Sequence, residues 1–171
     1  MKKSILLMLL FAGMLIPAGA QKFALVDMEY ILKNIPAYER ANEQLSQTSK
    51  KWQAEVEALN TQAQSLYKNY QNELVFLSAD QKKQREQAIL NKEKEASDLK
   101  KKYFSPDGEL YKKRESLVGP IQNEIYSAVK GIAEQRGFSL VLDRASDNGI
   151  VFASPTADIS NEVLAKLGYS K

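Results

Sequence analysis

The sequence predicts an α+β protein that is mostly α, with a long antiparallel helical hairpin, a tentacle-like coiled coil, on a small base of β-strands. Three observations lead to this fold class. Residues 37–77 contain no Gly and no Pro and carry apolar residues at seven-residue spacing. A second, polar helical stretch follows after a clear reversal. Strand-like segments occur only near the two ends of the chain, so the hairpin must bring these ends together.

The first long helix is predicted from two interleaved apolar series. Leu45, Trp52, Leu59 and Leu66 recur every seven residues, and a second series is offset from them by four. Alternating spacings of four and three are typical of a helix that packs lengthwise on another helix. The members of this hairpin seam are Leu45, Trp52, Val56, Leu59, Ala63, Leu66, Tyr70 and Leu77. At 1.5 Å per residue the helix would reach roughly 60 Å, which makes it a rod.

The chain is predicted to reverse at Ser78, which caps a returning helix and has Gln81 as its capping-box partner. That returning helix, at residues 81–103, has few apolar residues and needs the first helix as a packing partner. A break with Pro and Gly at residues 103–108 interrupts the helical pattern. A third helix follows, and Gly137 is expected to end it in a left-handed conformation.

The base is predicted from segments at both ends of the chain. Residues 22–28 and 138–143 have strand patterns, residues 149–153 are expected to pair with the second strand as a hairpin, and a short helix is expected at 161–167. Open edges in so small a sheet favour pairing with another copy, so we expect a homo-oligomer. The residues expected to build this base are Phe23, Leu25, Val26, Phe138, Leu140, Val141, Leu142, Ile150, Val151 and Phe152.

The first twenty residues have the pattern of a secretory signal peptide. Two lysines precede an uncharged apolar stretch at residues 4–16, and Ala18 and Ala20 provide the small residues that a signal peptidase reads. The stretch is short for a membrane span, although an uncleaved anchor is the alternative. We expect cleavage after Ala20 and a soluble exported chain. The expected domains are a signal peptide at 1–20, a base at 21–36 and 137–171, and an arm at 37–136.

The composition argues against catalysis. The chain has no Cys and no His, so it lacks a thiol nucleophile, a Ser–His pair and the usual ligands of zinc and copper. Carboxylate or Ser–Lys hydrolysis stays formally open, but it requires a concave site that a rod on a small base hardly offers. We therefore expect no enzyme activity, no metal site and no cofactor.

Charge is distributed unevenly along the hairpin. The whole chain has 24 Lys and Arg and 21 Asp and Glu. Removal of Lys2 and Lys3 with the predicted signal peptide leaves 22 basic and 21 acidic side chains, so the mature chain is nearly neutral. Residues 81–114 nevertheless hold eleven basic and six acidic side chains. The basic runs at 100–102 and 112–114 are interpreted as solvated helix faces, with a weak contact with an anionic membrane surface as the alternative. Nucleic-acid binding is not expected, because no recognition module is present.

The chain resembles the Skp/OmpH family of periplasmic chaperones for outer-membrane proteins. The resemblance lies in the export signal, the strand at 23–28 that leads to Pro36, the polar hairpin, and above all the closing segments 137–143, 150–152 and 158–164. Each motif is weak by itself, and it is their order that is specific. The resemblance extends over essentially the whole predicted mature chain.

The resemblance implies a homotrimer that is joined at its strands, with helical arms around a cavity. Unfolded outer-membrane β-barrel proteins would be held there without ATP. The predicted function is therefore that of a periplasmic holdase, and the alternative is a structural or adaptor coiled-coil protein of the cell envelope. The best-known members of the family are strongly basic, whereas this mature chain is nearly neutral. Electrostatic capture is therefore not expected to dominate.

Aromatic side chains on the arm are the candidates for contact with clients. Aromatic rings offer a large contact area at a modest cost in conformational entropy, and many weak contacts suit a protein that must also release what it holds. The candidates are Tyr67, Phe76, Tyr103, Phe104 and Tyr111. The seam residues, Trp52 and Tyr70 among them, are expected to pack the two helices together.

Overall fold

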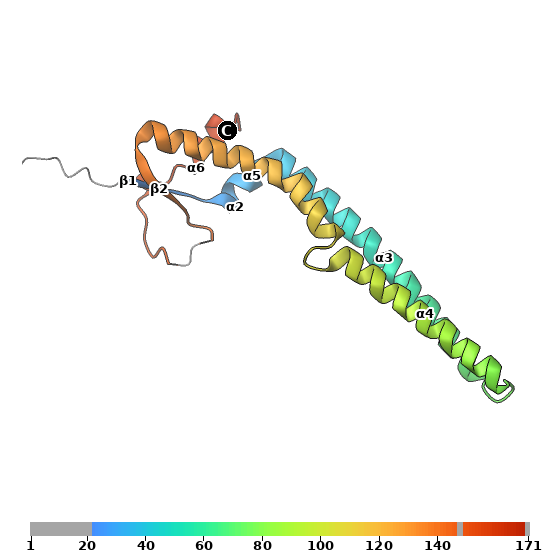
Figure 1. Cartoon of the computed structure of the whole chain (residues 1–171). Helices are drawn as coiled ribbons and strands as arrows, with labels where there is room; N and C mark the ends of the chain where they lie inside the picture. The colour runs from blue at the N-terminus through green and yellow to red at the C-terminus, as the bar shows by residue number, and fades with distance from the viewer. Residues whose placement is uncertain (1–21, 147–148, 170–171) are drawn as a thin grey trace, which may run out of the picture.

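The structure is a computed structural model that describes residues 22–146 and 149–169. The predicted signal peptide lies outside the described residues, as do two residues of the predicted turn between 143 and 149. A long arm of antiparallel helices extends from a base where the two ends of the described chain meet (Figure 1). This arrangement confirms the predicted fold class.

The arm consists of α3 (Pro36–Glu73) and α4 (Ala79–Phe104). Pro36 occupies the first turn of α3, where its missing N–H costs no hydrogen bond. The helix ends at Glu73, four residues before the predicted end, because the chain uses residues 74–78 to reverse. The predicted capping box is confirmed: the backbone N–H of Gln81 donates to Ser78 Oγ at 3.3 Å, and the backbone N–H of Ser78 donates to Gln81 Oε1 at 2.9 Å.

Small and aliphatic side chains lie between the two helices of the arm. Val56 and Ala63 of α3 are buried, as are Ile89 and Ala96 of α4. The other members of the hairpin seam are half-buried: Leu45, Trp52, Leu59, Leu66, Tyr70 and Leu77. The few apolar residues of α4 are therefore enough to hold it as a helix, because they pack against the apolar residues of α3.

Aromatic and polar contacts join α3 and α4 at two levels. Near the base, the rings of Trp52 and Tyr103 stack with their centroids 4.5 Å apart, and the Tyr103 hydroxyl donates to Glu55 at 2.7 Å. Near the far end, Arg85 and Glu73 form an ion pair at 3.0 Å. These contacts fix the register of one helix against the other.

Helix α5 (Glu109–Arg136) returns the chain to the base. Its residues Ile121, Ile125, Ala128 and Ile132 belong to the hydrophobic core of the base. This differs from the expected domains, which assign all of residues 37–136 to the arm. The difference arises because the apolar stripe of α5 is complete enough to cover the base as well as to contact α3. Gly137 ends the helix with φ = 70°, the predicted left-handed cap.

The base contains a two-stranded parallel sheet of β1 (Lys22–Val26) and β2 (Phe138–Asp143). Parallel neighbours require a crossover connection, and here the whole arm is that crossover. Helices α2 (Met28–Lys33), α5 and α6 (Ser160–Lys166) pack around the sheet. The core residues are Ala24, Val26, Ile31, Ile35, Ile121, Ile125, Ala128, Ile132, Ile159, Val163 and Leu164.

The predicted strand at residues 149–153 is wrong for this chain. The structure has no strand there, and Val151 and Phe152 are 98% and 84% exposed. The chain instead forms the short 3₁₀ helix η1 (Pro155–Ala157) and then pairs Asp158 with Leu25, on the side of β1 that faces away from β2. Because the segment crosses to β1, it cannot fold back on β2 as a hairpin.

Polar contacts tie the start of the described chain to its end. The guanidinium of Arg144 lies 3.2 Å from a carboxylate oxygen of Asp27 and 3.2 Å from one of Asp158. Asp143 Oδ1 accepts hydrogen bonds from the backbone N–H of Met28 at 3.1 Å and of Ala145 at 3.0 Å. The base is thus closed by side chains as well as by its core.

Candidate functional site: the exposed apolar surface of the arm

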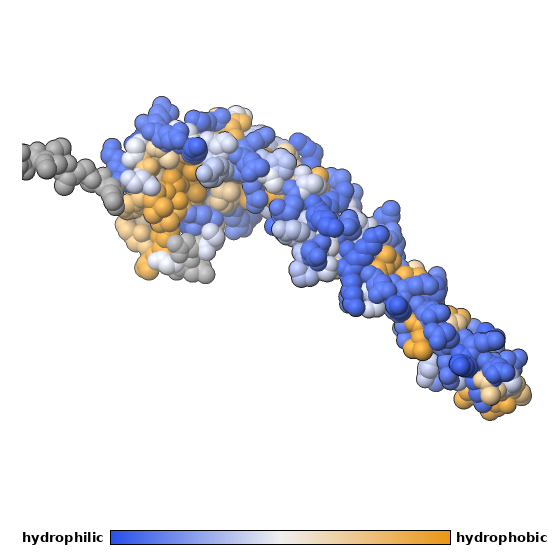
Figure 2. Space-filling model, in the orientation of Figure 1, coloured by the Kyte–Doolittle hydropathy of each residue, from blue (hydrophilic) through white to orange (hydrophobic). Residues whose placement is uncertain are grey.

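The far end of the arm carries an exposed apolar cluster. Leu74, Val75 and Phe76 form the turn between α3 and α4, and Val75 and Phe76 are 82% and 85% exposed. Figure 2 shows hydrophobic residues gathered at this end of an otherwise mostly hydrophilic arm. We call residues 74–76 the arm tip. Water-exposed apolar side chains at a turn contribute no core packing, so they are available to a partner.

The arm tip exists because the polar residues next to it are used for capping. Ser78 and Gln81 satisfy each other's backbone groups and start α4 immediately after the turn. The backbone N–H of Phe76 donates to the carbonyl of Glu73 at 2.9 Å, which closes the turn on the α3 side. A short turn held at both ends directs the apolar side chains outward.

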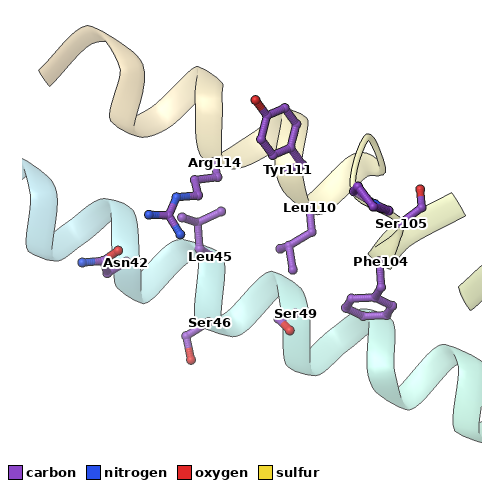
Figure 3. A pocket seen from close by; sticks show the side chains of 10 residues that line it. Asn42, Leu45, Ser46, Ser49, Phe104, Ser105, Leu110, Tyr111 and Arg114 are labelled. Atoms are coloured by element: carbon purple, nitrogen blue, oxygen red, sulfur yellow. The ribbon is translucent and has the colours of Figure 1, made fainter. Parts of the chain in front are cut away.

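A second apolar surface lies where α4 gives way to α5. Four residues, 105–108, separate these helices, and the missing helical turn leaves an open groove of about 480 Å³ beside α3. We call it the junction groove. Figure 3 shows side chains from α3, α4 and α5 around it. Its lining residues are Asn42, Leu45, Ser46, Ser49, Phe104, Ser105, Pro106, Leu110, Tyr111 and Arg114.

The break that creates the junction groove is tightly built. The backbone N–H of Ser105 donates to the carbonyl of Lys101 at 3.1 Å, and that of Gly108 donates to the carbonyl of Ser105 at 2.9 Å. A Cβ atom added at Gly108 would lie 2.8 Å from the carbonyl oxygen of Tyr103. Glycine is therefore required at this close approach of backbone to backbone.

The five predicted client-contact residues lie in three kinds of surroundings. Phe76 belongs to the arm tip, and Tyr67 lies on the exposed surface of α3, where its hydroxyl accepts a hydrogen bond from Gln71 at 2.8 Å. Phe104 and Tyr111 line the junction groove. Tyr103 is half-buried against Trp52, so its ring packs the arm, and it meets the ring of Phe104 in a T-shaped contact.

Sequence reasoning missed Leu74 and Val75 of the arm tip and Leu90 of α4, which is also exposed. The missing signal was the run of four apolar residues at 74–77, directly before a predicted reversal. Leu77 continues the seven-residue spacing of the hairpin seam, but the three residues before it do not, so Leu74, Val75 and Phe76 cannot all be packing residues of one helix face.

Hydrogen bonds from tyrosines to carboxylates perturb two hydroxyls within the arm. The hydrogen bond to Glu86 raises the pKa of the Tyr70 hydroxyl, and the hydrogen bond to Glu55 raises the pKa of the Tyr103 hydroxyl. Both groups therefore stay neutral and act as hydrogen-bond donors across the hairpin.

The predicted base residues divide into buried and exposed sets. Leu25 and Val26 are buried, and Phe138, Val141, Leu142 and Ile150 are half-buried. The exposed set is Phe23, Leu140, Val151 and Phe152. Phe23 lies beside Leu140 in the parallel register of β1 and β2, so the two side chains form a shared apolar surface on the sheet. Figure 2 shows apolar residues over this end of the base.

The described residues hold no group of three or more carboxylates that could bind a metal ion. Among the described helices, none has the length and apolar character that crossing a bilayer requires.

Comparisons with known proteins agree on one family. A family model described as "Outer membrane protein (OmpH-like)" matches residues 22–167. The chain is 25% identical over 148 residues to the chaperone protein Skp of Yersinia enterocolitica, covering 86% of this chain and 87% of that protein. It is 23% identical over 149 residues to the chaperone protein Skp of Pectobacterium atrosepticum, covering 87% of each.

A solved structure extends the likeness to three dimensions. It comes from Caulobacter crescentus CB15 and is described as that of an OmpH-like outer membrane chaperone. The match has a TM-score of 0.66 at 14% sequence identity and covers 87% of this chain and 85% of the other. At this identity the likeness shows that the two chains share a fold.

Proposed function

The chain belongs to the OmpH-like outer membrane protein family, and from this premise we propose that it is an ATP-independent holdase chaperone of the periplasm. In this function the arm binds unfolded outer-membrane β-barrel proteins and prevents their aggregation. The names of the two Skp relatives support the proposal. We further propose export by the signal peptide, with cleavage after Ala20, and no catalytic step or cofactor.

The observation that carries the proposal is apolar surface displayed at separate points of a long polar arm. Val75 and Phe76 are exposed at one point, and Phe104 and Tyr111 line a groove at another. An unfolded chain can touch both places at once. Several weak contacts along one client then give useful overall affinity, while each single contact still dissociates readily.

Apolar contact is the main force in this proposal. The predicted mature chain is close to neutral, and several charges of α4 and α5 are already paired, including Lys92 with Glu95 at 2.6 Å and Lys112 with Glu109 at 3.2 Å. Exposed charges are also screened by salt. The basic side chains of α4 and α5 then contribute steering, and any contact with an anionic membrane surface is weak.

A homotrimer joined at the base is part of the proposal. Phe23, Leu140, Val151 and Phe152 leave apolar area uncovered in the single chain. Among the described residues no strand pairs with the outer edge of β2. A neighbouring copy that supplies a strand there would cover both the edge and the apolar side chains.

Suppression of aggregation tests the proposed function. Purified mature protein is mixed with a β-barrel membrane protein diluted from urea, and light scattering is followed over time. We expect the scattering to fall toward zero at one trimer per client. Scattering that stays unchanged would reject the holdase and favour the alternative, an adaptor that uses the arm as a spacer between two envelope partners.

The double variant Val75→Ser, Phe76→Ser tests the arm tip in the same assay. It removes exposed apolar area without touching the hairpin seam, so we expect folding to be unchanged and suppression to require several-fold more protein. Tyr126→Ser is the matched control, because Tyr126 is an exposed aromatic residue of α5 outside both surfaces. Equal behaviour of the two variants would show that the tip does not contact clients.

A further inference from the structure

The junction groove combines apolar walls with one unpaired cation. Leu45, Phe104 and Leu110 provide apolar walls from three helices. The guanidinium of Arg114 extends from α5 toward α3 and lies beside Leu45 (Figure 3). Within the described residues Arg114 forms no ion pair and no hydrogen bond. Its planar fork of donors therefore has no protein partner within the described part of the chain and is open to a ligand from solvent.

The α3 side of the groove supplies polar groups that suit a peptide backbone. Asn42 and Ser46 line the groove, and neither side chain bonds to another described residue. An extended segment of an unfolded protein carries unpaired backbone N–H and C=O groups. An amide and a hydroxyl along one wall can satisfy some of them without selecting a sequence.

We infer that the junction groove binds extended client segments in which a bulky apolar side chain stands next to a carboxylate. The apolar side chain packs against Leu45, Phe104 and Leu110, and the carboxylate pairs with Arg114. The inference rests on the proposed function and adds the class of segment that this site prefers. A volume of about 480 Å³ is enough for a small ligand, and its open side favours rapid release.

A single guanidinium favours a single carboxylate over a membrane surface. Sites for anionic lipid headgroups usually gather several basic side chains, whereas Arg114 is the one charged residue that lines the groove. Arginine binds carboxylates through two parallel N–H···O bonds, and this geometry gives the contact direction as well as energy.

Three labelled peptides test the inference on the intact oligomer. Each is eight residues long, is blocked at both ends and is built from Gly and Ser around a central pair. The pairs are Phe-Asp, Phe-Asn and Ala-Asp, and binding is measured by fluorescence anisotropy at low salt. We expect Phe-Asp to bind about fivefold more tightly than Phe-Asn, the size of a good solvent-accessible ion pair. Ala-Asp should bind more weakly than Phe-Asp because it lacks the apolar contact.

Two variants assign the preference to the groove. Arg114→Gln should make Phe-Asp and Phe-Asn bind equally. Lys113→Gln is the matched control: it removes the same charge from the neighbouring residue of α5, which does not line the groove. It should keep the fivefold preference.

The outcomes separate this inference from the proposed function. Equal binding of Phe-Asp and Phe-Asn by the wild type, no binding of any peptide, or a preference that survives in Arg114→Gln would each overturn the inference. If Arg114→Gln and Lys113→Gln both lost the preference for Phe-Asp over Phe-Asn, the preference would come from general charge attraction and the inference would be overturned. The proposed function is tested separately, by light scattering with a whole unfolded β-barrel protein. Suppression of aggregation in that assay would support the holdase even if the peptides showed no preference.

Discussion

Trp52 and Tyr103 show how the arm is positioned by individual side chains. Their rings are nearly parallel, with 5° between the planes, and the Tyr103 hydroxyl also bonds to Glu55. The adjacent residue, Phe104, lies about 100° further round the helix and lines the junction groove instead. Both rings are half-buried, but Tyr103 packs against α3 whereas Phe104 forms part of the groove wall.

Trp52→Ala should destabilise the arm by about 2–3 kcal/mol, because it removes a half-buried ring and leaves Tyr103 without its stacking partner. Trp52→Phe keeps a stacked ring and should cost about 1 kcal/mol or less. Urea unfolding followed by circular dichroism measures both variants. Equal stability of Trp52→Ala and wild type would mean that the stack does not hold the hairpin, and Tyr103 would return to the set of free client contacts.

Asp143 makes the stability of the base depend on pH. Burial raises the pKa of its carboxyl, but hydrogen bonds from the Ser146 hydroxyl and from the backbone N–H groups of Met28, Ala145 and Ser146 outweigh burial and leave the pKa below its ordinary value. A lowered pKa in the folded state stabilises the protein above the unfolded pKa of about 3.9. This stabilisation disappears as the pH falls through the folded pKa.

Asp143→Asn should therefore reduce the loss of stability on acidification. Urea midpoints at pH 7 and pH 3 provide the measurement, and the difference between them should be smaller in the variant than in the wild type. Asp98→Asn, on the exposed surface of α4, is the control and should keep the wild-type difference. A variant that loses as much stability as the wild type would show that Asp143 is not an acid-sensitive contact.

At the scale of elements, local rules predicted the helices and several of their ends. The capping box of Ser78 and Gln81 and the left-handed Gly137 follow from a few neighbouring residues, and the hairpin seam follows from spacing alone. The strand at 149–153 was wrong because a short apolar run does not reveal which sheet edge, or which chain, it will meet. The end of α3 was misplaced because the pattern continues into the turn.

The surfaces on the arm were predictable only in part, for the same reason. Composition identified the aromatic residues, but the phase of α4 against α3 decided that Tyr103 packs and that Phe104 lines a groove. The groove itself depends on three helices meeting at one break. No spacing within a single helix indicates such a place.

The break between α4 and α5 should be sensitive to a single methyl group. Gly108→Ala places a Cβ atom 2.8 Å from the Tyr103 carbonyl oxygen and 3.0 Å from that of Lys102, so backbone must move, at a cost of about 1–3 kcal/mol. Gly119→Ala is the matched control. It adds a Cβ atom inside α5 with nothing within 4 Å. Because Gly119 precedes Pro120, whose ring disfavours a helical residue with a Cβ, the usual gain of alanine over glycine is offset and stability should stay within about 0.5 kcal/mol of the wild type. Thermal unfolding of both variants measures this difference.

If Gly108→Ala were as stable as the wild type, the break would not be fixed by close backbone packing. A flexible break would also make the junction groove a transient feature. In that case the preference of Arg114 for a peptide carboxylate would be absent as well. The thermal unfolding of Gly108→Ala and the peptide-binding measurement therefore test the same structural feature.

The whole molecule keeps apolar surface exposed at both of its ends, for different reasons. The base exposes Phe23, Leu140, Val151 and Phe152 and, among the described residues, leaves the outer edge of β2 without a partner strand, whereas the arm tip exposes a turn with no strand nearby. Backbone groups at a strand edge can be satisfied by another copy of the chain, and a turn offers no such pairing. The base is therefore suited to permanent association, and the tip to reversible contact.

Phe152→Asp should dissociate the oligomer. In the proposed trimer Phe152 is buried between subunits, and an unpaired carboxylate in such an interface costs several kcal/mol. Because Phe152 is 84% exposed in the single chain, the same change should leave the fold of each subunit intact, with an unchanged helical signal in circular dichroism. Multi-angle light scattering should give the mass of one chain for this variant and of three chains for the wild type. Phe76→Asp makes the identical change at the arm tip and should keep the mass of three chains. A Phe152→Asp protein that still had that mass would place the subunit interface elsewhere on the base.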